Sequence, residues 1–173
     1  TGWVGYTLSW TQLQFDSLNF GEKYYARYDR RHDISVVGIY KLNDRITLSG
    51  TWVYGTGNAV TLPTSEYLAI DHDPGSGSTG SGSPFPQQPY YVEDFGKKND
   101  FRMAAYHRLD FGVQFHRKTK WGSRTFEASV YNAYNRKNPF YYYVGYNASG
   151  TQRILRQVSL FPVLPSVSWT FKF

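Results

Sequence analysis

The sequence has no cysteine and only one methionine among its 173 residues. Without cysteine, neither a disulfide framework nor a thiolate metal site is available to stabilise the fold. No stretch approaches the roughly 18 consecutive apolar residues of a transmembrane helix. The first residues also lack the basic and apolar regions of a signal peptide. These absences exclude covalent cross-links and helical membrane spans, but not a membrane β-barrel, whose strands carry a much weaker hydropathy signal.

Aromatic residues are unusually frequent in the sequence. Tyrosine, phenylalanine and tryptophan make up 19% of the chain, yet its mean hydropathy is only −0.53. A soluble core would draw more on leucine, isoleucine and valine. Aromatic side chains in excess suit surfaces that are apolar at one end and wet at the other, such as membrane interfaces.

The formal net charge is +6, and such a balance often indicates nucleic-acid binding. The basic residues are scattered among the predicted strands and turns, however, and no long lysine and arginine block occurs. We therefore expect no nucleic-acid partner.

The residues from Ser166 to Phe173 alternate strictly between polar and apolar side chains. Successive side chains of a strand point to opposite faces, so this pattern predicts a two-faced strand. Five other segments repeat the pattern less cleanly, and no segment predicts a helix. They are Val4–Thr11, Asp33–Leu42, Arg45–Trp52, Arg108–His116 and Thr125–Tyr131.

The connections between the six predicted strands alternate strictly between long and short. A soluble antiparallel sheet explains the alternating side chains equally well, but it has no reason to collect every long connection at one end. An outer-membrane barrel does, because its periplasmic turns are short and its extracellular loops are long. The connections run approximately over Gln12–Arg30, Asn43–Asp44, Gly55–Tyr106, Arg117–Arg124 and Asn135–Gln157.

The fold class predicted is therefore an all-β, antiparallel transmembrane β-barrel. Large apolar side chains such as Leu109, Phe111 and Val113 face lipid, and serine, threonine, glutamine and charged side chains face a polar lumen. Six strands cannot close such a barrel, whose known minimum is about eight. We expect residues 1–173 to be the C-terminal part of a larger barrel domain, with 71–89 as a flexible extracellular loop. Aromatic girdles are expected at Tyr40, Trp52, Tyr54, Trp169 and Phe173.

Four stretches of the sequence resemble the C-terminal barrel strands of TonB-dependent outer-membrane receptors, particularly those of Bacteroidetes. They read YYARYDRRHDISVVGIYKLNDRITLSGTWVYGTGNAVTLP, RMAAYHRLDFGVQF, EASVYNAYNRKNPF and SLFPVLPSVSWTFKF. The resemblance covers most of the chain outside the loops. It implies a barrel of about 22 strands and an N-terminal plug domain, which these residues do not contain.

The resemblance also implies a function and a set of partners. It implies TonB-dependent active transport of a nutrient ligand across the outer membrane of a Gram-negative bacterium, with this segment forming barrel wall and extracellular loops. The partners would be the rest of the barrel and its plug, TonB, the barrel-assembly machinery, the lipid bilayer and, in many relatives, a surface lipoprotein. Two alternatives stay open: a non-transporting barrel subunit, and a small barrel enzyme, which would need more strands and a lipid-facing Ser/His pair.

The last strand is similar to the signal that the barrel-assembly machinery recognises in this family. Trp169, Phe171 and Phe173 occupy its alternating aromatic positions. An unpaired edge strand is a template for strand addition. The same side chains could simply anchor the strand in the bilayer, and the two interpretations are compatible.

Candidate ligand-binding residues lie at the predicted extracellular end. Arg30, Arg31 and His32 precede Asp33, and His107 and Arg108 begin the fourth predicted strand. Arginine offers bidentate hydrogen bonds to anionic or sugar ligands, although an ion-pair network among strand ends explains the same residues. Tyrosines in the last long connection could stack on a ligand or pack on a neighbouring loop. They are Tyr141, Tyr142 and Tyr143, followed by Tyr146.

No pattern predicts catalysis, a metal or a cofactor. Residues 71–75 begin like a calcium loop, but the later ligands are missing. The four histidines lack zinc-site spacing, and no G-x-S-x-G nucleophile elbow occurs. We therefore expect a protein that is not an enzyme.

Overall fold

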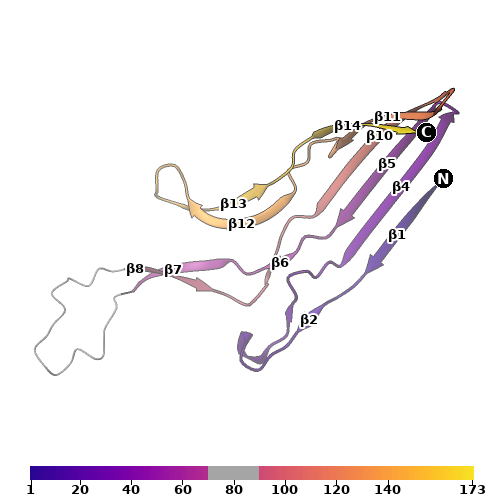
Figure 1. Ribbon diagram of the computed structural model, residues 1–173. Helices are drawn as coiled ribbons and strands as arrows, with labels where there is room; N and C mark the ends of the chain where they lie inside the picture. The colour runs from indigo at the N-terminus through magenta and orange to yellow at the C-terminus, as the bar shows by residue number, and fades with distance from the viewer. Residues whose placement is uncertain (70–89) are drawn as a thin grey trace, which may run out of the picture.

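The protein is all-β with antiparallel sheets, as the sequence predicts, in a computed structural model that describes residues 1–69 and 90–173. Six strands form the main sheet in the order β1-β4-β5-β10-β11-β14, each antiparallel to its neighbours (Figure 1). Their bounds are β1 Gly2–Leu8, β4 His32–Asn43, β5 Ile46–Gly55, β10 Tyr106–Thr119, β11 Gly122–Tyr131 and β14 Leu164–Lys172.

The main sheet has one apolar face and one polar face. Directly opposite residues of an antiparallel pair share a face. One row across four strands joins Val4, Val36, Trp52 and Leu109. Apolar exceptions on the polar face occur on β1 and β4, namely Trp3, Val37 and Ile39. Another apolar row joins Phe115, Phe126 and Trp169, and the polar row between strands β5 and β14 joins Ser49, Gly112, Ser129 and Ser166.

Long and short connections lie at opposite ends of the main sheet. The ends of β4 and β10 lead into short two-residue turns, and we call this the turn end. All three long connections leave from the other end, which we call the loop end (Figure 1). The alternation predicted from the sequence is therefore confirmed among the described residues.

The long connections contain strands that the sequence did not predict. Every long connection contains paired antiparallel strands that continue beyond the main sheet. The first contains β2–β3, the second contains β6–β9 and β7–β8, and the third contains β12–β13. A single 3-10 turn spans Asn19–Gly21. The predicted flexible loop at 71–89 and the partial calcium-loop pattern within it lie outside the described residues. The bounds are β2 Gln12–Leu13, β3 Tyr24–Tyr25, β6 Ala59–Val60, β7 Pro63–Ala69, β8 Tyr90–Phe95, β9 Phe101–Arg102, β12 Pro139–Tyr146 and β13 Arg153–Ser159.

The first turn lies one residue further along the chain than predicted. Asn43 still pairs with Ile46, so Asp44 and Arg45 form the turn. The Asn43 side-chain oxygen accepts hydrogen bonds from the backbone N–H groups of Arg45 and Ile46, at 2.9 Å each. An asparagine side chain that replaces a backbone acceptor in this way fixes a tight turn locally.

Buried apolar side chains are confined to the loop end. Within residues 1–69 and 90–173 they are only Tyr24, Ala26, Ala59 and Met103, and none belongs to the main sheet. Conversely, Val4, Val167 and Trp169 on the apolar face are each about 70% exposed. The main sheet therefore has no protein core on its apolar face in the part of the chain that the structure describes. No helix among those residues has the length and apolarity to cross a membrane.

Candidate functional site

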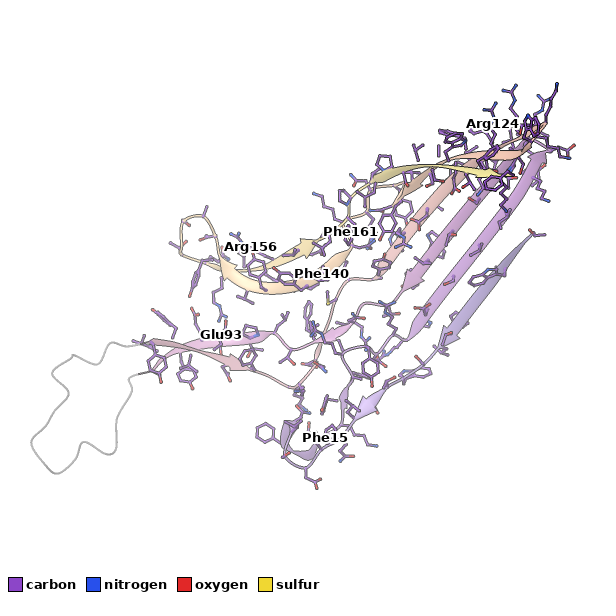
Figure 2. The ribbon with its side chains drawn as sticks, viewed as in Figure 1. Phe15, Glu93, Arg124, Phe140, Arg156 and Phe161 are labelled. Carbon is purple, nitrogen blue, oxygen red and sulfur yellow. The ribbon has the colours of Figure 1, made fainter. Side chains whose placement is uncertain are left out.

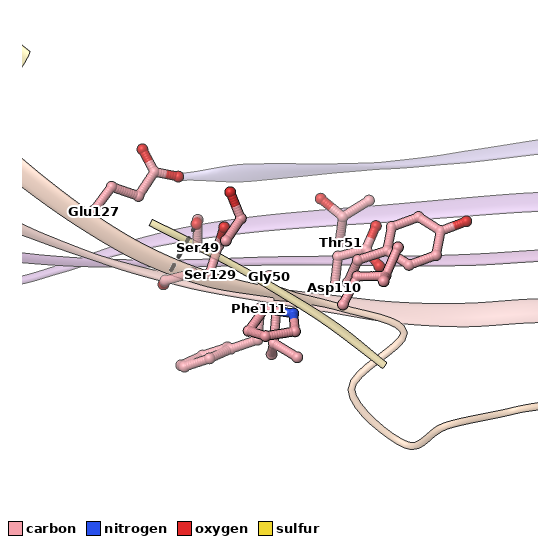
Figure 3. Close-up of a pocket in the computed structure, with 13 residues that line it drawn as sticks. Ser49, Gly50, Thr51, Asp110, Phe111, Glu127 and Ser129 are labelled. Atoms are coloured by element: carbon pink, nitrogen blue, oxygen red, sulfur yellow. Dashed lines mark hydrogen bonds between the residues drawn. The ribbon is translucent and has the colours of Figure 1, made fainter. Parts of the chain in front are cut away.

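A hollow of about 470 Å³ lies against the polar face between β5 and β14 (Figure 3). Ser49, Ser129 and Ser166 line it from the polar row, with Asp110 and Glu127 beside them. Ser49 hydroxyl donates to the Gly112 carbonyl at 3.4 Å. The lining is thus rich in hydroxyls and carboxylates, which suits contact with water or a polar ligand.

Both carboxylates of the hollow have partners within the sheet. Glu127 accepts a hydrogen bond from the Gln114 amide at 3.0 Å. Asp110 forms an ion pair with Arg108 at 2.9 Å and accepts from the backbone N–H of Asn132 at 3.0 Å. These contacts fix the two side chains against the sheet.

The predicted cluster Arg30, Arg31 and His32 does not converge on one point. Arg31 donates to the Tyr25 hydroxyl at 2.7 Å, and Arg30 pairs with Asp33 at 3.4 Å with both side chains well exposed. His32 lies on the apolar face, where its ring stacks on Tyr6. Neighbouring residues of an extended segment point to opposite sides, which separates residues that are adjacent in sequence.

His107 and Arg108 are separated in the same way. His107 shares the apolar face with Tyr54, and its Nδ1 lies 2.7 Å from the Tyr134 hydroxyl. Arg108 lies on the polar face above the hollow, with its guanidinium 4.1 Å from the centre of the Tyr131 ring. Of the predicted ligand-binding residues in these two clusters, Arg108 is the one placed beside the hollow.

The predicted tyrosines lie on hairpin β12–β13. Tyr142 donates to Gln157 at 2.9 Å and packs edge-on against Phe101 of β9. Tyr141 and Tyr143 point to the other side of the strand, pack against each other and stay over 40% exposed. The structure therefore divides this group: Tyr142 packs on a neighbouring connection, and Tyr141 and Tyr143 are exposed on the other side of the hairpin.

A buried ion pair at the base of the loops escaped the sequence analysis. Asp29 is fully buried and lies 2.6 Å from Arg102, which also donates to the carbonyl of Gly57 at 3.0 Å. The Tyr25 ring has guanidinium groups near 5 Å from its centre, those of Arg31 and Arg102. Cation–π contacts of this kind stabilise two neighbouring arginines even though only one of them, Arg102, has a carboxylate partner here. The partners are more than 70 residues apart in sequence, so no local motif signals them.

Asn132 is a second feature that sequence reasoning missed. It is almost fully buried at the end of β11, with a positive φ of 54°. Its amide donates to the carbonyls of Arg136 and Phe161, at 2.9 and 3.2 Å. Asparagine tolerates the left-handed conformation, so the Asn-Ala-Tyr-Asn stretch at 132–135 was the available signal.

The long connections also bind one another through polar contacts. Lys97 pairs with Glu22 at 2.7 Å, and the hydrogen bond and charge of that carboxylate raise the pKa of Lys97. Between the hairpins β7–β8 and β12–β13, Tyr146 donates to Glu66, which raises the pKa of the Tyr146 phenol. Arg153 lies 3.8 Å from both Glu66 and Glu93. Figure 2 labels Glu93 on the β7–β8 hairpin.

The predicted assembly residues lie on the apolar face of β14 and just beyond it. Trp169 is opposite Phe126, Phe171 is opposite Arg124, and the Phe171 and Phe173 rings are 6.1 Å apart. All three side chains are exposed, and their role in barrel assembly stays a prediction.

No group of three or more potential metal ligands occurs among residues 1–69 and 90–173. Comparisons with protein-family models, curated proteins and solved structures find no match to the chain.

Proposed function

We propose that the chain forms part of the wall of a transmembrane β-barrel in the outer membrane of a Gram-negative bacterium. The apolar face of the main sheet lies against lipid, and the polar face lines the lumen. The observation that carries this proposal is the apolar face itself, which spans six strands and is not covered by any described residue. An uncovered apolar surface of this size in water is a binding or aggregation surface.

The two edges of the sheet support the same proposal. Strands β1 and β14 each have one neighbour among the described strands. In a bilayer, an open edge leaves backbone groups unpaired at several kcal/mol each, so only closed barrels are stable there. Further strands of a larger barrel, of about 22 strands in the family that the sequence resembles, would pair with both edges.

The transport function rests on this wall. We propose TonB-dependent import of a nutrient ligand, with the loop end outside the cell, the hollow facing the lumen, and a plug domain closing the barrel. Arg108 and the exposed pair Tyr141 and Tyr143 are the best-placed residues for ligand contact. No covalent step is involved. TonB, the barrel-assembly machinery and a surface lipoprotein are the proposed partners.

Site-directed spin labelling of β10 tests the membrane wall. Because the chain lacks cysteine, single cysteines at consecutive positions from 109 to 114 carry the label without interference from this chain. In the full-length protein in phospholipid bilayers, labels at Leu109, Phe111 and Val113 should collide with oxygen, which dissolves in hydrocarbon. Labels at Asp110 and Gln114 should instead collide with a water-soluble nickel complex.

The control is a comparison, position by position along β10, of the accessibility to oxygen with the accessibility to the nickel complex. A lipid-facing wall gives oxygen and nickel accessibilities that alternate with a period of two residues and in opposite phase. If the apolar positions were inaccessible to both reagents, protein rather than lipid would cover them. Equal nickel accessibility on both faces would place the sheet in water. Either outcome would contradict the proposal.

A further inference from the structure

The turn end carries the entire excess of positive charge in the chain. The segments 40–46, 117–124 and 171–173 hold seven basic residues against a single acid, Asp44. Their net charge of +6 equals the formal net charge of all 173 residues, so the remainder of the chain is balanced. The basic residues are Lys41, Arg45, Arg117, Lys118, Lys120, Arg124 and Lys172.

The two ends of the sheet also differ in how their charges are paired. At the loop end, Arg102 pairs with Asp29, Arg108 with Asp110 and Lys97 with Glu22. At the turn end, no ion pair joins any of the seven basic residues to a carboxylate within 1–69 and 90–173. The turn end therefore presents basic side chains that are free to meet an anion from outside the described residues.

Arg117 and Arg124 are the most unusual members of this group. They are directly opposite each other in the β10–β11 pair, and both lie on the apolar face. Like charges in this position repel and destabilise a strand pair. The adjoining row on the same face is Phe115 with Phe126, and Phe171 lies opposite Arg124 on β14. Figure 2 shows Arg124 at the turn end of the sheet.

A phosphate group would relieve this repulsion. A guanidinium group is planar, always charged and suited to bidentate hydrogen bonds with phosphate oxygens. The row of Phe115, Phe126 and Trp169 marks a part of the face that contacts acyl chains, and the arginine pair lies in the next row toward the turn end, beside Phe171. Lipid headgroup phosphates lie at this border between hydrocarbon and water, and anionic lipids attract basic residues there.

We propose that Arg117 and Arg124 form a binding site for the headgroup phosphate of an anionic phospholipid in the leaflet next to the short turns. The neighbouring phenylalanines contact the acyl chains of the bound lipid. The site rests on the proposed membrane wall. It means that the turn end of this wall binds anionic phospholipids in preference to neutral ones. Lys118 and Lys172, both opposite Ser123 on the polar face, do not contribute to it.

Fluorescence quenching by nitroxide-labelled lipids tests the site. A bimane fluorophore on a cysteine at Phe126, two residues from Arg124 on the same face, reports which lipid is adjacent. The full-length protein is placed in phosphatidylcholine bilayers containing nitroxide-labelled phosphatidylglycerol or nitroxide-labelled phosphatidylcholine. We expect stronger quenching by phosphatidylglycerol. R117Q/R124Q should lower the relative association constant of phosphatidylglycerol roughly 25-fold, since each of the two basic residues contributes about fivefold.

The matched control is K118Q/K172Q. It removes the same charge from the same end of the sheet, but from the polar face, and should leave the preference for phosphatidylglycerol unchanged. An equal loss in both double variants would mean diffuse electrostatic attraction and would overturn the site. Unchanged quenching by labelled phosphatidylcholine verifies that each variant is still inserted in the bilayer.

Two further outcomes separate the possible failures. If labelled phosphatidylcholine does not quench bimane at position 126 in the unmodified wall, the apolar face does not contact lipid, and the proposed membrane wall fails. If it quenches but phosphatidylglycerol has no advantage, only the lipid site fails. If inorganic phosphate abolishes the advantage, the site takes a soluble anion, and the assignment to a lipid is overturned.

Discussion

Asp29 joins the first two long connections where they leave the main sheet. It is fully buried, accepts a hydrogen bond from the backbone N–H of Thr11 at 2.6 Å, and lies 2.6 Å from the guanidinium of Arg102. It thereby joins the segment before β2 to strand β9 in a different connection. Burying such a pair has a desolvation cost, but removing one partner leaves the other charge uncompensated, which costs more.

The substitution Asp29→Asn should loosen the base of the loops by about 3 kcal/mol, the usual order for breaking a buried pair. The amide of asparagine keeps an acceptor for Thr11 but offers no charge to Arg102. Amide hydrogen exchange measures this as faster exchange at Ala26 and Met103, whose N–H groups bond to Thr11 and Asn58.

The substitution Glu22→Gln is the control for this prediction. It breaks the ion pair with Lys97, in which both side chains are more than half exposed. Exposed pairs contribute little because water and salt screen them. Exchange at Ala26 and Met103 should stay unchanged in this variant. Equal protection in Asp29→Asn and the parent protein would show that the buried pair is dispensable.

At the scale of single elements, the short turns determine how closely the strands approach. Gly122 begins β11 after the turn at Lys120 and Trp121, with φ of +151°. A Cβ atom added there would lie 1.9 Å from the carbonyl oxygen of Lys172 on β14. Only glycine avoids this overlap, so the glycine allows β14 to pair with the start of β11.

The substitution Gly122→Ala should separate the turn ends of β11 and β14. The overlap is with backbone rather than with a flexible side chain, so relief requires a shift of the strand. We expect a loss of roughly 1–3 kcal/mol, as for other strained backbone positions, measured as faster amide exchange along Thr170–Lys172. Gly150→Ala is the matched control, because Gly150 also has a positive φ (+70°) but has no atom within 4 Å of an added Cβ. Similar exchange changes at Thr170–Lys172 in both variants would contradict the role of the overlap.

The strands of the main sheet were predictable because each follows the period of two on its own. The rows Val4–Val36–Trp52–Leu109 and Ser49–Gly112–Ser129–Ser166 arise from a pattern visible in each strand before any pairing is known. The alternation of long and short connections then predicted that all long connections leave from the same end of the sheet. The turn at Asn43 was placed one residue early because the asparagine side chain, rather than a left-handed backbone at 43–44, makes the turn.

The hairpins within the long connections were not predictable in this way. Strand β12 contains four tyrosines and one phenylalanine in eight residues, so it has no polar partner positions to alternate with. Strands β6 and β9 are two residues each and pair across more than 40 residues of sequence. Such pairs are fixed by tertiary contacts, which a local pattern does not encode.

The candidate site was predictable only as a region. Sequence clustering placed Arg30, Arg31 and His32 at the loop end, where they do lie. It did not predict that they divide between opposite sides, since that depends on the phase of the strand they enter. The contact of Arg102 with the Tyr25 ring, which Arg31 also approaches, could not be identified because Arg102 belongs to another connection.

At the scale of the whole molecule, the long connections form a linked group rather than separate loops. Lys97 and Glu22 join the second connection to the first, and Tyr146 and Arg153 join the third to the second through Glu66. Figure 1 shows the hairpins leaving the same end of the sheet. A change in one connection is therefore transmitted to its neighbours through a few polar contacts.

Alkaline pH should weaken the link between the third connection and the second, because it removes the Tyr146 contact and leaves the ion pairs of Arg153. The pKa of Tyr146 is raised above its ordinary value of 10.0, first because the phenol donates a hydrogen bond to Glu66, and then through burial and the carboxylate charge. The neutral phenol is thus favoured in the folded state. The contribution of this contact is complete below pH 10.0, where the free phenol is also neutral, and is lost as the pH rises through the raised pKa of Tyr146.

Ultraviolet difference titration measures the raised pKa of Tyr146 directly. Subtracting the titration of Tyr146→Phe from that of the parent protein isolates one phenol, which should ionise at a higher pH than free tyrosine. In Glu66→Ala the same subtraction should return the transition toward the ordinary value, because the acceptor and its charge are gone. Gln157→Ala, which removes the acceptor of Tyr142 on the same hairpin, should leave the Tyr146 transition in place. A Tyr146 transition that is unaffected by Glu66→Ala would mean that Glu66 does not hold the phenol in its neutral form, and that pH does not act on the link through this contact.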